Sequence, residues 1–469
     1  MNNYSDPYRQ LEVLSGNMID AVMSLLMTVL TIIMIAVAII IVVRFAAKVE
    51  KMKRGKLDIT IGKYSVCGIT FGKVIGPIMA YSKYNREGHV LAMGGSGTGK
   101  TSALLIPSLD SWDGSSFTID ISGDIEKNTH MDDKLIYEPE AMNTVPYNVF
   151  YAIDKQCLDA DKNQALEKLA FLLMPDLPPQ EASANARFYN DEGRKILTAS
   201  LIAFYHNGYD FIDICTKIMK SNYKQLFSEI DNTGNELAIR YINSFDGAPE
   251  QNTAGCKQSA DAAIKLFATN HYVMNSVRRP RNGEESFTPD SIENNNVFFI
   301  VDDSRLDVYS PLVHLVVAQV LEYFSNRSNV ADHNILLCLD ELASFGKLEL
   351  VGALRKLRKK KVRIFCLTQS LADLNMIYGH EETKAMLNNF SYKVVLSASD
   401  TETQEYFTKL IGHKDVSKSF YDRLLEFKGV ATKQKEYAIE PEALGYLGNK
   451  LILLYPGGYV KLRKKYYFK

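Results

Sequence analysis

A glycine-rich run at residues 94–101, Gly-Gly-Ser-Gly-Thr-Gly-Lys-Thr, constrains the possible fold more than any other feature of the chain. It fits the pattern GxxxxGK[ST], follows an apolar β-like run and precedes a helical run. Glycines permit positive φ angles, so consecutive backbone N–H groups can surround phosphates, and the following helix adds its positive N-terminal end. A glycine-rich turn without a nucleotide is the alternative, but the complete motif in this context predicts a nucleoside triphosphate site.

The loop residues have separate expected roles. Lys100 reaches the β- and γ-phosphates, and Thr101 supplies a hydroxyl to Mg²⁺. ATP and Mg²⁺ are therefore the expected ligands. The predicted nucleotide-binding residues are Gly94, Gly95, Ser96, Gly97, Thr98, Gly99, Lys100, Thr101 and Ser102.

Further along the chain, a second group of polar residues lies at the ends of two apolar runs. Asp340 and Glu341 follow the run Ile-Leu-Leu-Cys-Leu, and Gln369 ends the run 363–369. Asp340 is the predicted metal-side carboxylate together with Thr101, and Glu341 is the predicted base that activates the attacking water. Gln369 is expected beside the γ-phosphate, where it positions water or reports hydrolysis to the rest of the domain. An acidic pair at a strand end also caps helices, and Gln369 is equally well a turn residue.

Alternating strand and helix patterns predict an α/β fold. Six short apolar runs read as buried strands, at residues 89–93, 116–120, 297–302, 335–340, 363–369 and 392–398. Their separation by helical patterns predicts a mostly parallel sheet covered on both faces. Between about residues 155 and 275 only helical patterns occur, which predicts an all-α insertion. The basic and aromatic run 461–469 is expected to form a final edge strand with solvated lysines.

One segment is too apolar for a soluble protein. Residues 21–43 carry no charge and would span about 34 Å as a helix, enough to cross a bilayer once. Basic residues dominate the stretch 44–63, so the positive-inside rule places the body in the cytoplasm. The expected location is the cytoplasmic (inner) membrane, with a single pass.

Composition excludes several other classes of protein. The 54 basic and 55 acidic residues nearly cancel, so any nucleic-acid site has to be a local patch or a pore lining. The 6 cysteines contain no CxxC pair, which argues against a zinc finger and a disulfide scaffold.

Taken together, these motifs resemble the type IV coupling proteins of bacterial conjugation and type IV secretion, the TraG/TraD-type P-loop ATPase family. The resemblance covers most of the chain, and the order and spacing of its motifs make it specific. They are the phosphate loop with SALLIPSL after it, FTIDISGDI (117–125), YNVF (147–150), FYNDEGRKILTASLIAFY (188–205), ILLCLDELASFGKLE (335–349), LRKKKVRIFCLTQS (357–370) and the closing region 439–468.

The resemblance implies a membrane-anchored, RecA-like, homohexameric ATPase that passes a relaxase–DNA complex, with its single-stranded DNA, to the subunits of a type IV secretion channel. Arg358 is similar in position to the arginine finger of the family, with Arg355 as the alternative. It is expected at the end of the sheet where the nucleotide binds, facing sideways toward a neighbouring subunit. The stretch 355–363 also fits a solvated or DNA-contacting basic face. Ser122 stands where the D-x-K-G motif of the family commonly has lysine.

The expected division of the chain follows from these assignments. It comprises an extracytoplasmic N-terminus (1–20), a transmembrane helix (21–43), a juxtamembrane segment (44–84), the nucleotide-binding domain in two parts (85–206 and 263–469) and the all-α insertion (207–262). Two other functions remain open: a coupling ATPase for protein-only cargo, and a DNA translocase of the FtsK/HerA type.

Overall fold

The computed structural model describes residues 22–44, 59–63, 68–82, 88–177, 182–331, 333–414 and 436–468. The chain separates into two compact units, of which the first contains the apolar N-terminal helix and the second contains nearly all the rest. The expected N-terminal segment 1–20 lies outside the described residues, as do parts of the expected juxtamembrane segment.

The first unit is a continuous helix, Val22–Arg44, with a mean hydropathy of 3.2 and no buried residues. Its length and composition suffice to cross a membrane. A helix that is apolar on every side has no polar face to turn toward water, so it requires apolar surroundings. The expected helix at 21–43 is therefore present.

The second unit is built on a 12-stranded sheet in the order β1-β3-β2-β14-β13-β10-β4-β9-β8-β5-β7-β6. From β10 to β6 every neighbouring pair is parallel, whereas β13 pairs antiparallel with β10 and the outer strands form an antiparallel extension. The strands are β1 (Ile59–Lys63), β2 (Thr70–Ile75), β3 (Ile78–Ser82), β4 (His89–Gly94), β5 (Ser115–Asp120), β6 (Lys134–Tyr137), β7 (Asn296–Ile300), β8 (Ile335–Leu339), β9 (Val362–Thr368), β10 (Phe390–Ser397), β13 (Lys450–Tyr455) and β14 (Gly458–Arg463). A separate two-stranded sheet joins β11 (His413–Lys414) to β12 (Glu436–Tyr437).

All six predicted strands are present, as β4, β5, β7, β8, β9 and β10. Every residue of β4, β8 and β9 is buried, as expected for central parallel strands with both faces covered. Five further strands of this sheet, β1, β2, β3, β6 and β13, have no counterpart among the predicted strands.

Helices cover the sheet and form the inserted region. Outside the insertion lie α2 (Ile106–Asp110), α3 (Asp124–Asn128), α12 (Leu306–Ser325), α13 (Leu350–Leu357), α14 (Leu371–Tyr378), α15 (His380–Asn389) and α16 (Thr401–Ile411). Between β6 and β7 lie α4 (Tyr151–Asp154), α5 (Asp159–Leu173), α6 (Ala184–His206), α7 (Phe211–Lys220), α8 (Tyr223–Asp231), α9 (Glu236–Asn243), α10 (Glu250–Thr269) and α11 (His271–Ser276).

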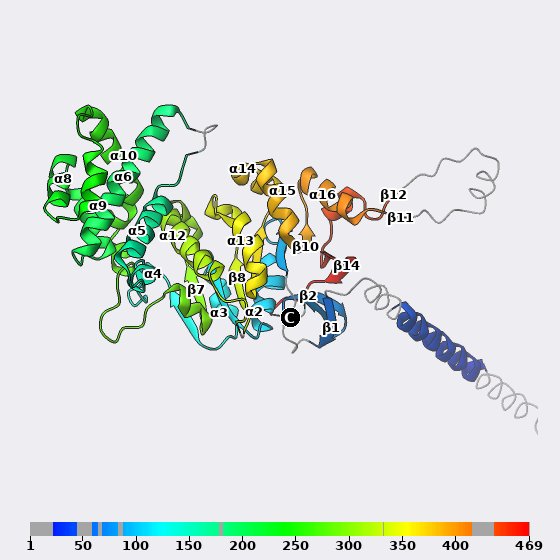
Figure 1. The fold of residues 1–469 in the computed structure, drawn as a ribbon. Helices are drawn as coiled ribbons and strands as arrows, with labels where there is room; N and C mark the ends of the chain where they lie inside the picture. The colour runs from blue at the N-terminus through cyan, green and yellow to red at the C-terminus, as the bar shows by residue number, and fades with distance from the viewer. Residues whose placement is uncertain are drawn as a thin grey trace, which may run out of the picture. The chain divides into compact units, whose positions relative to one another are not determined.

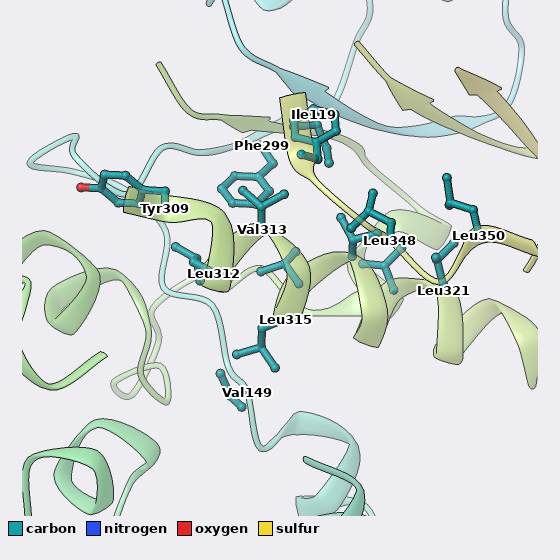
Figure 2. Close-up of a cluster of buried hydrophobic side chains, with 14 of the residues drawn as sticks. Ile119, Val149, Phe299, Tyr309, Leu312, Val313, Leu315, Leu321, Leu348 and Leu350 are labelled. Atoms are coloured by element: carbon teal, nitrogen blue, oxygen red, sulfur yellow. The ribbon is translucent and has the colours of Figure 1, made fainter. Parts of the chain in front are cut away.

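The core beside the sheet is organised around α12, whose side chains Leu312, Val313 and Leu315 are buried (Figure 2). Figure 2 shows Phe299 of β7 and Ile119 of β5 close to this helix, so the strands and α12 share one apolar core. This packing holds the ends of β5 and β7 in fixed positions.

The inserted region is entirely helical among its described residues, as predicted, and Figure 1 shows α6, α8, α9 and α10 gathered together. The predicted boundary at residue 262 falls inside α10, and α6 packs against α9 and α10 although it precedes residue 207. The helical layer therefore extends beyond 207–262 on both sides, and the division into domains stays a prediction.

The prediction of an edge strand at 461–469 was wrong in two respects. The strand β14 lies between β13 and β2 inside the sheet, and it ends at Arg463. Lys464 is buried rather than solvated, with 5 % of its surface exposed. Long-range pairing with β2, which the sequence did not reveal, places this segment in the interior.

Candidate nucleotide site

The phosphate loop connects β4 to a helix, as the motif predicts. Gly97 and Gly99 have φ angles of 71° and 93°, a region that glycine adopts without strain. A π-helical turn, Thr101–Leu105, then leads directly into α2. Ala103, Leu104 and Leu105 are fully buried, so packing fixes the start of this helix behind the loop.

A cavity of about 430 Å³ opens over the loop. It brings together residues from six segments that lie far apart in the sequence. Its lining comprises Gly95, Ser96, Gly97, Gly99, Lys100, Thr101, Ser102, Ile106, Ile121, Ser122, Asp124, Asp303, Asp340, Glu341, Ser344, Gln369 and Tyr467. The predicted site residues Lys100, Asp340, Glu341 and Gln369 thus share one cavity.

Two predicted loop residues support the loop instead of lining the cavity. Gly94 offers its carbonyl oxygen to Nζ of Lys100 at 2.6 Å. Thr98 donates from its hydroxyl to the carbonyl oxygen of Gly95 at 2.7 Å. Both contacts stabilise the turn from within.

Lys100 lies between the loop and the acidic pair. Its Nζ is 3.3 Å from Oε2 of Glu341, and both side chains are nearly buried. A lysine in this position carries a positive charge directly into the cavity, which suits the β- and γ-phosphates of a nucleotide.

Asp340 and Thr101 make the oxygen-rich corner of the cavity. The Thr101 hydroxyl donates to Oδ1 of Asp340 at 3.0 Å. Burial raises the pKa of Asp340 to about 7, and the hydrogen bond from Thr101 opposes this shift. Hard oxygen ligands such as these suit Mg²⁺, which is usually held by one or two carboxylates plus substrate phosphates. Within the described ranges, no group of three or more His, Cys, Asp or Glu that could bind a metal occurs.

Glu341 has an unusual backbone conformation. It has φ 59° and ψ 69°, a left-handed conformation that non-glycine residues rarely adopt. Burial raises the pKa of its carboxyl group, whereas the charge of Lys100 and a hydrogen bond from Gln369 oppose the shift. Gln369 therefore lies beside Glu341 in the structure.

Asp120, at the end of β5, has a role that was not predicted from the sequence. Its carboxylate accepts hydrogen bonds from the backbone N–H groups of Gly123, Ile125 and Glu126 at 2.8, 2.9 and 3.0 Å. Asp120 therefore fixes the start of α3 and the loop that carries Ser122, which faces the cavity. The aspartate of the D-x-K-G-like stretch is a structural acid in this chain.

Asp303 and Tyr467 are further lining residues that the sequence analysis missed. Asp303 follows directly after the predicted strand 297–302, at the edge where the other polar residues lie, and that position was an available signal. Tyr467 had no such signal, because its position depends on the pairing of β14.

Arg358 lies away from this cavity. It follows α13 and stands near His89, the first residue of β4. Burial lowers the pKa of His89 to about 4, with contributions in the same direction from the charges of Arg363 and Arg358. The expectation that Arg358 lies at the nucleotide edge of the sheet was wrong, because α13 returns the chain to the opposite edge before β9 begins.

Comparison with known proteins gives one extensive family match. A family model described as "Type IV secretory system Conjugative DNA transfer" matches residues 48–469. Among curated proteins, the chain is 23 % identical over 433 residues to protein VirD4 of Agrobacterium fabrum, which covers 86 % of this chain and 62 % of VirD4. It is 20 % identical over 384 residues to the conjugal transfer protein TraG of the same organism, which covers 78 % of this chain and 57 % of TraG. The chain thus spans about three fifths of the length of these relatives.

Solved structures show the same fold. The conjugative coupling protein TrwB, solved as TrwBΔN70, superposes with a TM-score of 0.65 at 20 % identity, over 80 % of this chain and 84 % of that structure. TrwB in complex with ADP and Mg²⁺ gives a TM-score of 0.64 at 19 % identity, over 81 % of this chain and 85 % of that structure. The predicted α/β fold, with a mostly parallel sheet, a helical insertion and an apolar N-terminal helix, is confirmed.

Proposed function

Because the chain belongs to the type IV secretory family for conjugative DNA transfer, we propose that it is a membrane-anchored ATPase that couples relaxase-bound single-stranded DNA to a secretion channel. The resemblance to the coupling proteins is borne out by the family match over residues 48–469. The observation that supports ATPase activity best is the convergence of Lys100, Asp340, Glu341 and Gln369 on one cavity over a phosphate loop.

ATP and Mg²⁺ are the proposed ligands of this cavity. TrwB has been crystallised with ADP and Mg²⁺ and with a non-hydrolysable ATP analogue, which supports the same assignment here. Thr101 and Asp340 would hold Mg²⁺, and the metal when bound would neutralise charge on the phosphates. The backbone N–H groups of the loop and Lys100 would hold the phosphate chain.

Glu341 is the proposed general base. In the structure it is paired with Lys100, and a bound phosphate would compete for that lysine. Loss of the pairing would free the carboxylate to accept a proton from water, and Gln369 beside it would orient the water. The raised pKa of Glu341 increases its basicity for this step.

Arg358 is proposed to act on the nucleotide of a neighbouring subunit in a hexameric ring. It lies at the opposite edge of the sheet from its own cavity, so it has no access to its own nucleotide. Arg358 is exposed, so an adjoining subunit can pack against it, and its guanidinium has donors in a fixed geometry that lysine lacks. Arg355, which is also exposed, is the alternative.

The helix Val22–Arg44 is the proposed membrane anchor. Basic residues follow it closely in the sequence, which supports a cytoplasmic position for the body. Channel subunits and the relaxase–DNA complex are the proposed partners of the protein.

The test is ATP hydrolysis by the purified full-length protein in detergent, with and without single-stranded DNA. We expect Mg²⁺-dependent turnover that rises with DNA, and loss of turnover in Lys100→Ala because the phosphates lose their neutralising charge. Glu341→Gln should bind ATP normally and lose on the order of 10²–10⁴ in turnover, since the amide keeps the shape of the side chain without its basicity.

Lys220→Ala is the matched control, because Lys220 is exposed at the end of α7 in the helical insertion and does not line the cavity. Normal turnover in purified Lys100→Ala would overturn the ATPase assignment. Stimulation by a relaxase protein but not by DNA would instead indicate protein-only cargo.

A further inference from the structure

The aromatic segment, which we define as residues 464–468 (Lys-Lys-Tyr-Tyr-Phe), lies against the phosphate loop. The backbone N–H of Tyr467 donates to the carbonyl oxygen of Ser102 at 3.0 Å. At the other end, the backbone N–H of Lys464 donates to the carbonyl oxygen of Asn449 at 3.1 Å. The segment is thus held at both ends by main-chain contacts that do not depend on side-chain identity.

The two tyrosines occupy different positions around the loop. A Cβ atom built on Gly99 would lie 3.1 Å from Cε1 of Tyr466, so the Tyr466 ring packs directly on the loop backbone. Tyr467 lines the cavity itself. Its ring centroid lies 5.1 Å from that of Phe468 in an edge-to-face arrangement, which supports its position.

The order of the strands determines which end of a nucleotide meets Tyr467. Two strands on one side of β4 carry the polar groups: β9 ends before Gln369, and β8 ends before Asp340 and Glu341. The aromatic segment approaches from the other side, because β14 lies beyond β10 and β13. A triphosphate whose γ-phosphate faces Glu341 therefore directs its nucleoside end toward the aromatic segment.

We propose that Tyr467 forms the nucleobase subsite of the cavity and stacks on a purine ring. This inference rests on the proposed function, since it requires a nucleoside triphosphate on the loop. Aromatic stacking accepts any base, because every base has a π-face. The subsite therefore adds affinity while discriminating little between adenine and guanine.

The experiment compares a ligand that has a base with one that lacks it. Isothermal titration calorimetry on the full-length protein in detergent, with Mg²⁺ present, gives Kd for ATP, GTP and inorganic tripolyphosphate. We expect Tyr467→Ala to weaken ATP and GTP about tenfold and equally, with tripolyphosphate unchanged. Tyr467→Phe should retain wild-type affinity, and Tyr467→Leu should resemble Tyr467→Ala, because it fills space without an aromatic face.

Two comparison variants separate the possible outcomes. Tyr446→Ala removes a tyrosine that is 89 % exposed and does not line the cavity, so it should change no affinity. Lys100→Ala should weaken the binding of all three ligands.

Equal weakening of ATP and tripolyphosphate binding by Tyr467→Ala, or no weakening of ATP binding, would overturn the proposed subsite. Failure of the wild-type protein to bind any of the three ligands would instead overturn the proposed function.

Discussion

Glu341 combines a left-handed backbone with a buried carboxylate. A non-glycine residue in this conformation costs on the order of 1–3 kcal/mol, so the surrounding contacts have to hold it in place. Lys100 and Gln369 supply two such contacts. Strain of this kind clusters at functional sites, which favours a chemical role for Glu341 over a merely structural one.

Among single residues, those that belong to a local motif were predictable. Lys100, Asp340 and Glu341 each follow an apolar run within a recognisable spacing, and the structure brings them together. Asp120 and Tyr467 were not predicted. The role of Asp120 depends on where α3 starts, and that of Tyr467 depends on the pairing of β14, and both arise only in the folded chain.

His89 provides a pH-dependent test at this scale. Its Nδ1 accepts the backbone N–H of Ile364 at 2.9 Å, and its Nε2 lies 2.8 Å from the carbonyl oxygen of Leu354, so the ring is neutral in the folded state. Burial lowers its pKa from 6.5 to about 4, so the unfolded state binds the proton more readily. The stability from His89 is therefore complete above about pH 6.5, and roughly 3 kcal/mol is lost as the pH falls to 4.

Urea unfolding of wild type and His89→Gln at several pH values measures this effect, because the amide provides a donor and an acceptor but does not titrate. The wild-type advantage should shrink between pH 6.5 and 4. An advantage that stays constant over this range would contradict the assignment.

At the scale of elements, the parallel strands were predictable, whereas the antiparallel extension was not. The hairpin of β2 and β3 turns at Gly76 and Pro77, which was an available turn signal, but nothing local indicates that β14 pairs with β2. The wrong prediction of the sheet edge at which Arg358 lies also concerns an element, because it depends on the direction of α13. A helix that connects parallel strands has to run back to the starting edge of the sheet, and α13 does so.

Two glycine-to-alanine substitutions should have opposite effects. A Cβ on Gly193 of α6 would lie 2.6 Å from the carbonyl oxygen of Cys256 in α10, so Gly193→Ala forces these helices apart and should cost about 1–3 kcal/mol. A Cβ on Gly352 of α13 meets nothing within 4 Å. Gly352→Ala should therefore stabilise the protein by about 0.5–1 kcal/mol, through the unfolded chain and helix propensity.

Thermal unfolding of both variants beside wild type measures the contrast. A Gly193→Ala protein as stable as Gly352→Ala would show that α6 and α10 do not pack as closely as the structure indicates.

At the scale of the whole molecule, the cavity and Arg358 lie at opposite edges of one sheet, and the proposed ring joins them between subunits. Mixing Arg358→Ala subunits with Glu341→Gln subunits tests this arrangement, since each is expected to be inactive alone. Some interfaces in a mixed ring pair an intact Glu341 with an intact Arg358, so part of the ATPase activity should return.

The control mixes Arg358→Ala with the double variant Arg358→Ala/Glu341→Gln, which cannot form such an interface. Tandem purification on two different tags shows that the rings are mixed. Absence of recovery in confirmed mixed rings, at every mixing ratio, would count against action between subunits.

The position of β4 also affects how the chain is made on the ribosome. Its two neighbours are β9 (Val362–Thr368) and β10 (Phe390–Ser397), although β4 itself ends at Gly94. At about 5–20 residues per second, roughly 15–60 seconds of translation separate the synthesis of β4 from that of its last partner. During that interval an apolar strand has no edge to pair with, so the nascent chain is a natural substrate for chaperones. The phosphate loop at its end is therefore expected to gain its native shape only late in translation.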